Sequence, residues 1–297
     1  MNHSSPADRS TPQTGALYAV LAYSAWGLLP IYWKFFGQVP AVEVLSHRII
    51  WSALFLMVVL WVQHRQTEFW QIWQPKLLKG LLLTALLLAF NWGLYIYGVN
   101  TDRVVETSLG YFINPLVNVL LGFLFLKERL HRSQQVAVGL AALGVAYFIW
   151  QFGSVPWIAL GLAISFAFYG LLRKVIAVAP LSGLAVETLL ITPLALVIIT
   201  YLAQTDQGHW GANPVLTVLF LGCGFVTSFP LLWFNNAAKR LRLSTLGFFQ
   251  YLAPSFQLLL GVLLYREPFT FTHAVTFGLI WTALLVYSVS SLNGRSV

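Results

Sequence analysis

Charged residues are scarce in this sequence. Only 9% of its 297 residues are Asp, Glu, Lys or Arg, whereas 58% are hydrophobic, and the stretch from Ser133 to Leu172 contains no charged residue and no His. A water-soluble domain of this composition could not cover its surface with polar groups. In lipid, a backbone must satisfy its own hydrogen bonds, and a helix of about 20 apolar residues crosses the hydrocarbon. The composition therefore predicts an all-α integral membrane protein.

Cysteine is also rare, and the common nucleotide-binding and hydrolase motifs are absent. The single Cys223 excludes an intramolecular disulfide and a cysteine-based metal cluster, and the six His residues show no paired ligand spacing. No Walker-type G-x-x-x-x-G-K-[ST] segment occurs, and neither G-x-S-x-G nor H-E-x-x-H is present. We therefore expect no metal, no cofactor, no enzymatic activity and no direct use of ATP.

The apolar runs, separated by Pro, Gly and charged residues, predict ten transmembrane helices. The uncharged run from 133 to 172 must hold two of them, because forty residues of helix would reach about 60 Å, twice the hydrocarbon thickness. Residues 1–14 are polar but lack the basic region and cleavage site of a signal peptide, so we expect the first span to be retained. The expected spans are residues 15–35, 41–62, 77–99, 104–126, 133–151, 157–176, 184–203, 214–238, 244–265 and 272–291.

Basic residues fall mostly on one side of this topology. With ten spans, the two termini and the loops after every second helix share one side, and that side carries thirteen of the seventeen Lys and Arg residues. The opposite side has three, Lys34, Arg103 and Arg266, and Arg48 lies within the second helix. The positive-inside rule then predicts a multi-pass protein of the plasma membrane with both termini in the cytoplasm. The net charge of +8 reflects this topology rather than nucleic-acid binding.

The two halves of the chain resemble each other. At slightly larger offsets than the main one, Trp26 matches Tyr169 and Glu43 matches Glu187. A shift of 139 residues aligns Asn91 with Pro230, Pro115 with Pro254, Gly122 with Gly261, Lys127-Glu128 with Arg266-Glu267, and Gly139 with Gly278. We therefore predict two five-helix repeats, residues 15–151 and 157–291, with tails at 1–14 and 292–297. Five crossings per repeat invert the second copy, and inverted repeats that meet at the bilayer midplane are typical of secondary transporters.

A polar stripe follows the fourth predicted helix. It consists of Glu106, Gly110, Asn114, Asn118 and Gly122, each four residues from the last. Asparagine in hydrocarbon needs a partner, which is either a neighbouring helix or a wet cavity. Asn114 and Asn118 are thus candidates for a substrate pathway, and helix packing is the alternative.

Three prolines lie within predicted spans, two of them at matched places in the two halves. Pro115, Pro230 and Pro254 each lack an N–H and free the carbonyl four residues earlier. Interrupted helices at corresponding positions point to a substrate site, so we expect these prolines to act as hinges. A simple kink filled by neighbouring helices is the alternative.

Glu43, His47 and Glu106 are candidates for proton coupling, because ionisable groups within a membrane usually mark a pathway or a proton relay. Both glutamates also lie near helix N-termini, where the helix dipole stabilises a carboxylate at little cost. Amide and aromatic side chains at mid-span complete the candidate pathway, as groups able to hold a flat, largely apolar solute by ring contact. These further candidates are Trp26, Asn91, Trp92, Tyr95, Tyr111, Tyr169, Trp233, Gln250, Tyr251 and Gln257.

Several segments are familiar as they stand. They include Ala25-Trp26-Gly27, E-V-L-S-H-R at 43–48, S-L-G-Y-F-I-N-P-L at 108–116, and R-L-R-L-S-T-L-G-F-F-Q-Y at 240–251. They resemble RarD-type members of the EamA group in the drug/metabolite transporter superfamily. The resemblance implies an inner-membrane permease of bacteria, built from two inverted five-helix halves, that exports drugs or metabolites. It also implies that the fifth and tenth helices lie behind the six that surround a central cavity.

These observations together predict a secondary active transporter that exports a small amphipathic metabolite or drug by alternating access. Its expected partners are a small-molecule substrate and the lipid bilayer, with no nucleic acid, and the protein is expected to be a monomer or a homodimer. A lipid-carrier flippase is the first alternative, and it would need a cavity open to the bilayer and lined by Arg or Lys. An intramembrane enzyme is the second, and it would need an embedded cluster of carboxylates or metal ligands.

Overall fold

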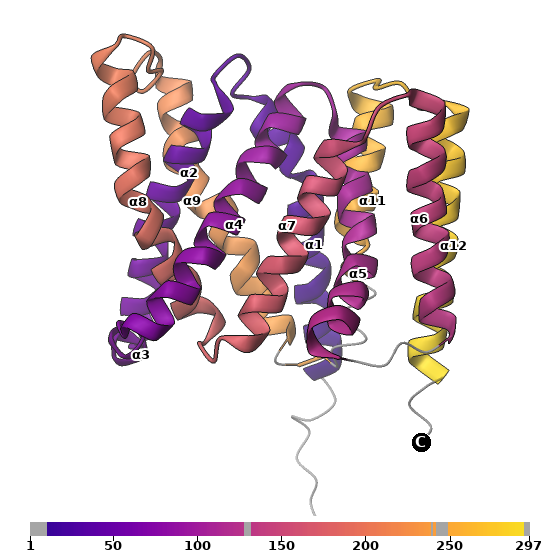
Figure 1. Cartoon of the computed structure of the whole chain (residues 1–297). Helices are drawn as coiled ribbons and strands as arrows, with labels where there is room; N and C mark the ends of the chain where they lie inside the picture. Colours follow the sequence, from indigo (N-terminus) through magenta and orange to yellow (C-terminus); the bar gives the residue numbers. More distant parts are fainter. Residues whose placement is uncertain (1–10, 128–131, 239, 242–248, 294–297) are drawn as a thin grey trace, which may run out of the picture.

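The computed structural model describes residues 11–127, 132–238, 240–241 and 249–293, and no strand occurs among them. Within these described ranges, nine helices are long and apolar enough to cross a membrane, and a shorter apolar helix, Leu252–Leu264, lies at the tenth expected position. The first residues of that tenth span, expected at 244–265, fall outside the described part of the chain. The prediction of an all-α membrane protein with ten spans is confirmed (Figure 1).

The helices follow one another in the expected order (Figure 1). A short helix that the hydropathy pattern did not indicate, α3, follows the second span, and α1 and α8 each begin four residues before their expected starts. The bounds are α1 (Thr11–Lys34), α2 (Ala41–Val62), α3 (Gln66–Gln71), α4 (Pro75–Asn100), α5 (Val104–Leu126), α6 (Arg132–Phe152), α7 (Trp157–Val175), α8 (Pro180–Gln204), α9 (Pro214–Ala238), α11 (Leu252–Leu259), the π-helix η2 (Leu260–Leu264) and α12 (Phe271–Asn293).

Proline sets the starts of several helices. Pro75, Pro180 and Pro214 are the first residues of α4, α8 and α9, where the missing N–H has no intrahelical partner to lose. At the other ends, Lys127 and Arg266 both adopt a left-handed backbone with φ of 54°. These two residues occupy equivalent places in the two sequence repeats, so the halves share an uncommon local conformation as well as a sequence pattern.

Packing between the helices is reciprocal. Helix α1 of the first half packs on α9 and α11 of the second, and α7, which corresponds to α1, packs on α4 and α5. The pairs α2 with α8 and α6 with α12 join equivalent helices directly. The α6–α12 pair stands at one side of the bundle and reaches the rest mainly through α5 (Figure 1). This exchange of partners is what two inverted repeats of one unit produce.

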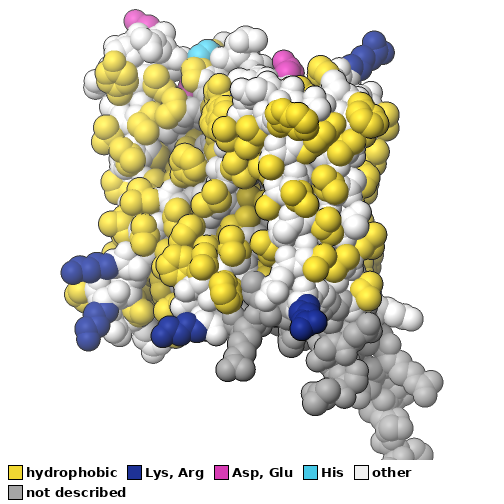
Figure 2. All heavy atoms as spheres, turned by 45° about the vertical axis from the view of Figure 1, so that its right-hand side comes forward, with side chains coloured by type: hydrophobic (Ala, Val, Ile, Leu, Met, Phe, Trp, Pro, Cys, Tyr) yellow, Lys and Arg dark blue, Asp and Glu magenta, His cyan; other side chains and the backbone are white. Residues whose placement is uncertain are grey.

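The outer surface suits a lipid environment. Large hydrophobic side chains such as Trp61, Leu143 and Val197 are more than 60% exposed on the helices. Figure 2 shows a hydrophobic middle band, with most of the visible Lys and Arg side chains at the lower edge. That edge is the end of the bundle at which α1 begins and α12 ends (Figure 1). The asymmetry of charge therefore runs along the membrane normal.

Candidate functional site

Arg48 is a buried cation without a counter-ion. It lies seven residues into α2, about 10 Å from the start of that helix, and is only 5% exposed. Its guanidinium carbon lies 4.0 Å from the ring centre of Trp92 on α4 and 4.9 Å from that of Trp33 on α1. Its Nε and Nη1 atoms are enclosed and have no hydrogen-bond partner. Among the described residues no carboxylate forms an ion pair with it. The ionisable side chains that interact electrostatically with its guanidinium are Tyr111, Cys223 and Tyr95.

Two tyrosines complete the surroundings of Arg48. The rings of Tyr95 on α4 and Tyr111 on α5 meet edge to face at 5.8 Å, and the Tyr95 hydroxyl is buried without a partner. The Nε1 atom of Trp33 is buried without a partner as well. We call Trp33, Arg48, Trp92, Tyr95 and Tyr111 the Arg48 cluster.

The Arg48 cluster lies where the two halves meet. All five of its residues come from the first half, and the same hydrophobic core includes Leu162 of α7 and Cys223 of α9 from the second half. Of the predicted pathway residues, Tyr95 and Tyr111 are in contact in this core, and Trp26 packs against it. Trp92 joins them through its contact with Arg48. Arg48 was absent from the predicted site, although a lone cation inside a span was a visible signal.

The asparagines hold helices together. Asn91 donates hydrogen bonds to the carbonyl oxygen of Leu162 at 3.0 Å and to the hydroxyl of Ser165 at 2.9 Å, and so ties α4 to α7. On α5, Asn114 donates to the carbonyl oxygen of Ala163 at 3.0 Å and accepts from Asn118 at 3.1 Å. These bonds agree with the packing interpretation that the sequence left open, and a role of the asparagines in a pathway stays a prediction.

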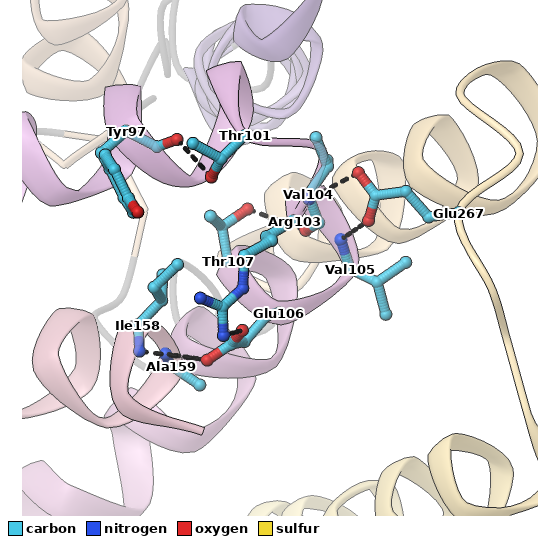
Figure 3. A network of polar contacts seen from close by, with 10 residues as sticks. All are labelled: Tyr97, Thr101, Arg103, Val104, Val105, Glu106, Thr107, Ile158, Ala159 and Glu267. Atoms are coloured by element: carbon cyan, nitrogen blue, oxygen red, sulfur yellow. Dashed lines mark hydrogen bonds and ion pairs between the residues drawn. The ribbon is translucent and has the colours of Figure 1, made fainter. Parts of the chain in front are cut away.

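Carboxylates hold two helix N-termini close together (Figure 3). Glu106 forms an ion pair with Arg103 and accepts a hydrogen bond of 3.0 Å from the N–H of Ile158, in the first turn of α7. Glu267, in the loop before α12, accepts 2.7 Å hydrogen bonds from the N–H groups of Val104 and Val105 at the start of α5. A hollow of about 260 Å³ lies beside these groups. Burial raises the pKa of Glu267 above the ordinary value, although the two N–H donors act in the opposite direction.

Sequence reasoning identified Glu106 but did not assign Glu267 to the site. The sequence feature that could have indicated Glu267 is its alignment with Glu128 in the repeat. Both glutamates follow the fourth predicted span of their half. Because Glu267 belongs to the second half and α5 to the first, its two hydrogen bonds fasten the halves together at this end of the bundle.

Glu43 fastens the halves at the same end. Its carboxylate, 2% exposed, accepts a hydrogen bond of 2.6 Å from the backbone N–H of His209 and lies 2.7 Å from the Nδ1 atom of that residue. His47 does not join this pair, because its ring stacks on Phe220 at 3.9 Å and on Trp210 at 5.0 Å. The two candidates for proton coupling on α2 therefore have separate partners.

Glu187, which matches Glu43 in the repeat, occupies the opposite end of the bundle. It is 1% exposed, and it accepts hydrogen bonds from the hydroxyl groups of Thr84 at 2.6 Å and Tyr169 at 3.2 Å. The Nε atom of Arg173 lies 3.6 Å from the same carboxylate. Tyr169, predicted for the pathway, thus belongs to this group, and the bond from Thr84 joins α4 to α8.

A third group of candidates lies along α1 and α11. The side-chain amide of Gln257 donates to the backbone carbonyl of Trp26 at 3.4 Å, and its Oε1 atom is buried without a partner. The carbonyl oxygen of Pro254 accepts a 2.8 Å hydrogen bond from Ser108 on α5. Here too a tie crosses between the halves.

The other predicted residues have neighbours outside the Arg48 cluster. Tyr251 stacks on Phe112 with ring centres 6.4 Å apart, and Trp233 packs edge-on to Phe229 at 4.7 Å. Gln250 is half-buried just before α11. None of these three belongs to the hydrophobic core that contains Trp33 and Tyr95.

The three prolines occupy different local settings. Pro115 and Pro230 lie inside α5 and α9, which continue as single helices on both sides. Pro254 lies in the first turn of α11, where proline removes no helical hydrogen bond. The π-helix η2 follows α11, and π-helical turns are frequent at functional sites. The action of the three prolines as hinges stays a prediction.

Comparison with known proteins gives a consistent result. The model of the EamA-like transporter family matches residues 13–150 and again residues 154–289. A protein of Vibrio cholerae named "Uncharacterized transporter" is 47% identical over 288 residues, 96% of this chain and 95% of that protein. Protein RarD of Escherichia coli is 46% identical over 288 residues, 96% of this chain and 97% of its own length.

A solved structure is similar in fold. A crystal structure of another protein superposes with a TM-score of 0.60 over 96% of this chain and 100% of that one. The sequence identity is 17%, so the likeness concerns the fold alone. The two matches to one family model, side by side along the chain, agree with the repeat that the sequence and the reciprocal packing display.

Proposed function

The chain belongs to the EamA-like transporter family, and from this premise we propose that it is a secondary active transporter that exports a small amphipathic solute by alternating access. The observation that carries the proposal is Arg48, a guanidinium enclosed where the two halves meet and lacking an acceptor in the described chain. An unpaired charge within a membrane is costly and usually marks a substrate or ion pathway. Solute would bind beside Arg48, against the rings of Trp92, Tyr95 and Tyr111.

Alternating access requires that the halves separate at one end while they stay joined at the other. Hydrogen bonds between the two halves, which could open and close in this way, lie at both ends of the bundle. At one end, Glu43 bonds His209, and Glu267 bonds the start of α5. At the other, Thr84 bonds Glu187. Each set contains a few hydrogen bonds to a carboxylate, and net contributions of about 1.5–3 kcal/mol each are small enough for solute binding to offset.

An ion gradient would drive the cycle, because the sequence has no nucleotide-binding segment. Glu43 and Glu106 are the candidates for proton coupling, since each carboxylate bonds a residue of the other half, His209 and Ile158 respectively, and would lose that partner when the halves separate at this end. His47, whose Nε2 atom is buried without a partner, is the third.

We place the basic end of the bundle, where α1 begins and α12 ends, in the cytoplasm (Figures 1 and 2). A reporter fused to the C-terminus tests this placement: a fluorescent protein that folds only in the cytoplasm should be bright, and alkaline phosphatase at the same place should be inactive. The reverse pair of results would contradict the orientation.

The transport proposal is tested in two steps. Metabolite profiles of media from cells that lack and cells that overproduce the protein identify solutes whose export depends on it. Counterflow of those solutes in proteoliposomes then measures transport by the purified protein. We expect saturable flux that empty liposomes lack, and the absence of protein-dependent flux for every such solute would contradict the proposal. The flippase alternative lacks support, because Arg48 is enclosed rather than open to lipid.

A further inference from the structure

Hydrogen-bond donors in the Arg48 cluster outnumber acceptors. Three of its enclosed atoms without partners, Nε and Nη1 of Arg48 and Nε1 of Trp33, can only donate, and the fourth is the hydroxyl of Tyr95, which can do either. Buried polar groups in proteins are normally paired, and an unpaired group calls for an explanation such as a ligand. Whatever completes this cluster must therefore bring acceptors and negative charge.

Arg48 contrasts with another arginine on a membrane helix. Arg173 on α7 lies beside the carboxylate of Glu187. On the first two turns of α2, Glu43 is the one carboxylate, and it is bonded to His209 instead. Arg173 thus has a counter-ion, whereas no carboxylate among the described residues pairs with Arg48.

The geometry at Arg48 favours a carboxylate. Trp92 and Trp33 contact the guanidinium through their rings, at 4.0 Å and 4.9 Å. Nε and Nη1 of the guanidinium have no partner in the described chain, and two parallel N–H bonds from a guanidinium match the two oxygens of a carboxylate. Cation–π attraction offsets part of the desolvation of Arg48 but supplies no acceptor.

The walls of the cluster favour a flat, apolar body joined to that carboxylate. Trp92, Tyr95 and Tyr111 present rings, and Leu29, Leu94 and Leu162 belong to the surrounding core. Aromatic and aliphatic walls with a few convergent polar groups are typical of sites for small apolar ligands. The polar groups here gather at the guanidinium.

We infer that the Arg48 cluster binds an organic anion, a small solute with a carboxylate joined to a flat apolar group. This inference rests on the proposed function, because it names the class of solute that the transporter would carry. The carboxylate accepts the N–H groups of Arg48, with Trp33 Nε1 and the Tyr95 hydroxyl as further donors, and the apolar group lies against the rings. Binding neutralises the buried charge, so occupied and empty sites differ in net charge.

Phenylacetate and phenylacetamide form a matched pair of probes, because they share shape and ring and differ in charge. Binding to the purified full-length protein in detergent is measured from tryptophan fluorescence and from the shift in melting temperature. Hydrogen bonds to a charged partner predict that phenylacetate binds roughly 10- to 100-fold more tightly than phenylacetamide. Equal affinity for the two probes would overturn the inference.

Variants of Arg48 test the assignment of the residue. Arg48→Met should remove the preference for phenylacetate while the empty protein melts at the same or a higher temperature, because an unpaired buried charge is lost. Arg48→Lys keeps the charge and should retain the preference at lower affinity. Lys76→Met, which removes an exposed cation in the first turn of α4, is the control and should change neither quantity. An unaltered preference in Arg48→Met, or a clear fall in its melting temperature without ligand, would contradict a ligand-binding role.

The outcome separates this inference from the proposed function. Protein-dependent counterflow of neutral solutes, with no preference for phenylacetate, would overturn the anion assignment and leave transport standing. Arg48-dependent binding of phenylacetate without flux of any solute would support the anion assignment and contradict the transport proposal. Arg48-dependent binding together with flux supports both.

Discussion

Asn114 on α5 donates a 3.0 Å hydrogen bond to the carbonyl oxygen of Ala163 on α7. One turn earlier, a side chain at Gly110 would place its Cβ 2.7 Å from the carbonyl oxygen of Ala159. The two helices therefore approach closely enough that only glycine fits between them, and Asn114 bonds across the same contact. Close approach through small residues, together with amide hydrogen bonds, is how membrane helices associate.

Replacing Asn114 should reduce stability. Asn114→Leu removes the bond to Ala163 and should lower the free energy of unfolding by about 0.6–1.7 kcal/mol, the range for such bonds between membrane helices. Asn118 is exposed on the same helix, and its bond to Asn114 stays within α5. Asn118→Leu is therefore the control for a bond between helices, with an expected change within about 0.5 kcal/mol. Thermal unfolding of both variants in detergent measures the difference. Equal stability of the two would show that the Asn114 bond does not hold α5 to α7.

The variant Glu106→Gln tests whether Glu106 couples transport to protons or only caps the start of α7. The variant loses the ion pair with Arg103 and weakens the acceptor for the start of α7. If Glu106 carries the coupling proton, pH-gradient-driven accumulation in proteoliposomes should disappear while solute exchange continues. Asp206→Asn, which removes an exposed carboxylate in the turn after α8, is the control and should transport normally. Accumulation that still follows the gradient in Glu106→Gln would leave Glu106 with the helix-capping role alone.

Glu267 should make the closure of one end depend on pH. Burial raises its pKa in the closed arrangement, where Lys34 and Asp102 are the charged neighbours, and a hydrated carboxylate in an open arrangement keeps its ordinary pKa. The closed form therefore binds a proton more readily. Its contribution to closure is fully present below the ordinary pKa of glutamate and is lost as pH rises through the raised pKa.

Hydrogen exchange at Val104 and Val105 measures this closure, because their N–H groups bond Glu267. Protection in the wild type, divided by that in Glu267→Gln at each pH to cancel intrinsic exchange, should fall as pH rises. The N–H of Ile158, held by Glu106 instead, serves as the internal control. A ratio that rises with pH would reverse the sign of the linkage.

Much of the fold could be predicted from the sequence. Apolar length indicates the spans, and α9 begins at Pro214 as expected. Helices α4 and α8 begin at Pro75 and Pro180, before the expected starts at 77 and 184, because proline is accommodated in a first turn. The repeat could be read because Lys127 and Arg266 match in sequence, and these two residues share a left-handed backbone.

The partners of polar side chains could not be predicted in the same way. Spacing by four residues places Glu106 and Asn114 on one stripe of α5, but it does not specify which helix faces that stripe. The structure shows that α7 faces both residues and provides their hydrogen-bond partners. For the same reason Arg48 was overlooked: its significance lies in the carboxylate that is missing from neighbouring helices, and a single sequence does not show which helices are neighbours.

The most direct test of the account uses Cys223, the only cysteine in the chain. It is fully buried in the core beside the Arg48 cluster, and its thiol donates a hydrogen bond to the carbonyl of Leu219 at 3.4 Å. A membrane-impermeant maleimide is applied to right-side-out and to inside-out vesicles, with Cys223→Ser as the blank. Alternating access predicts slow labelling of Cys223 from both faces, with rates that saturating phenylacetate changes. Labelling from one face alone under every condition, or from neither, would contradict a pathway that opens to each side in turn.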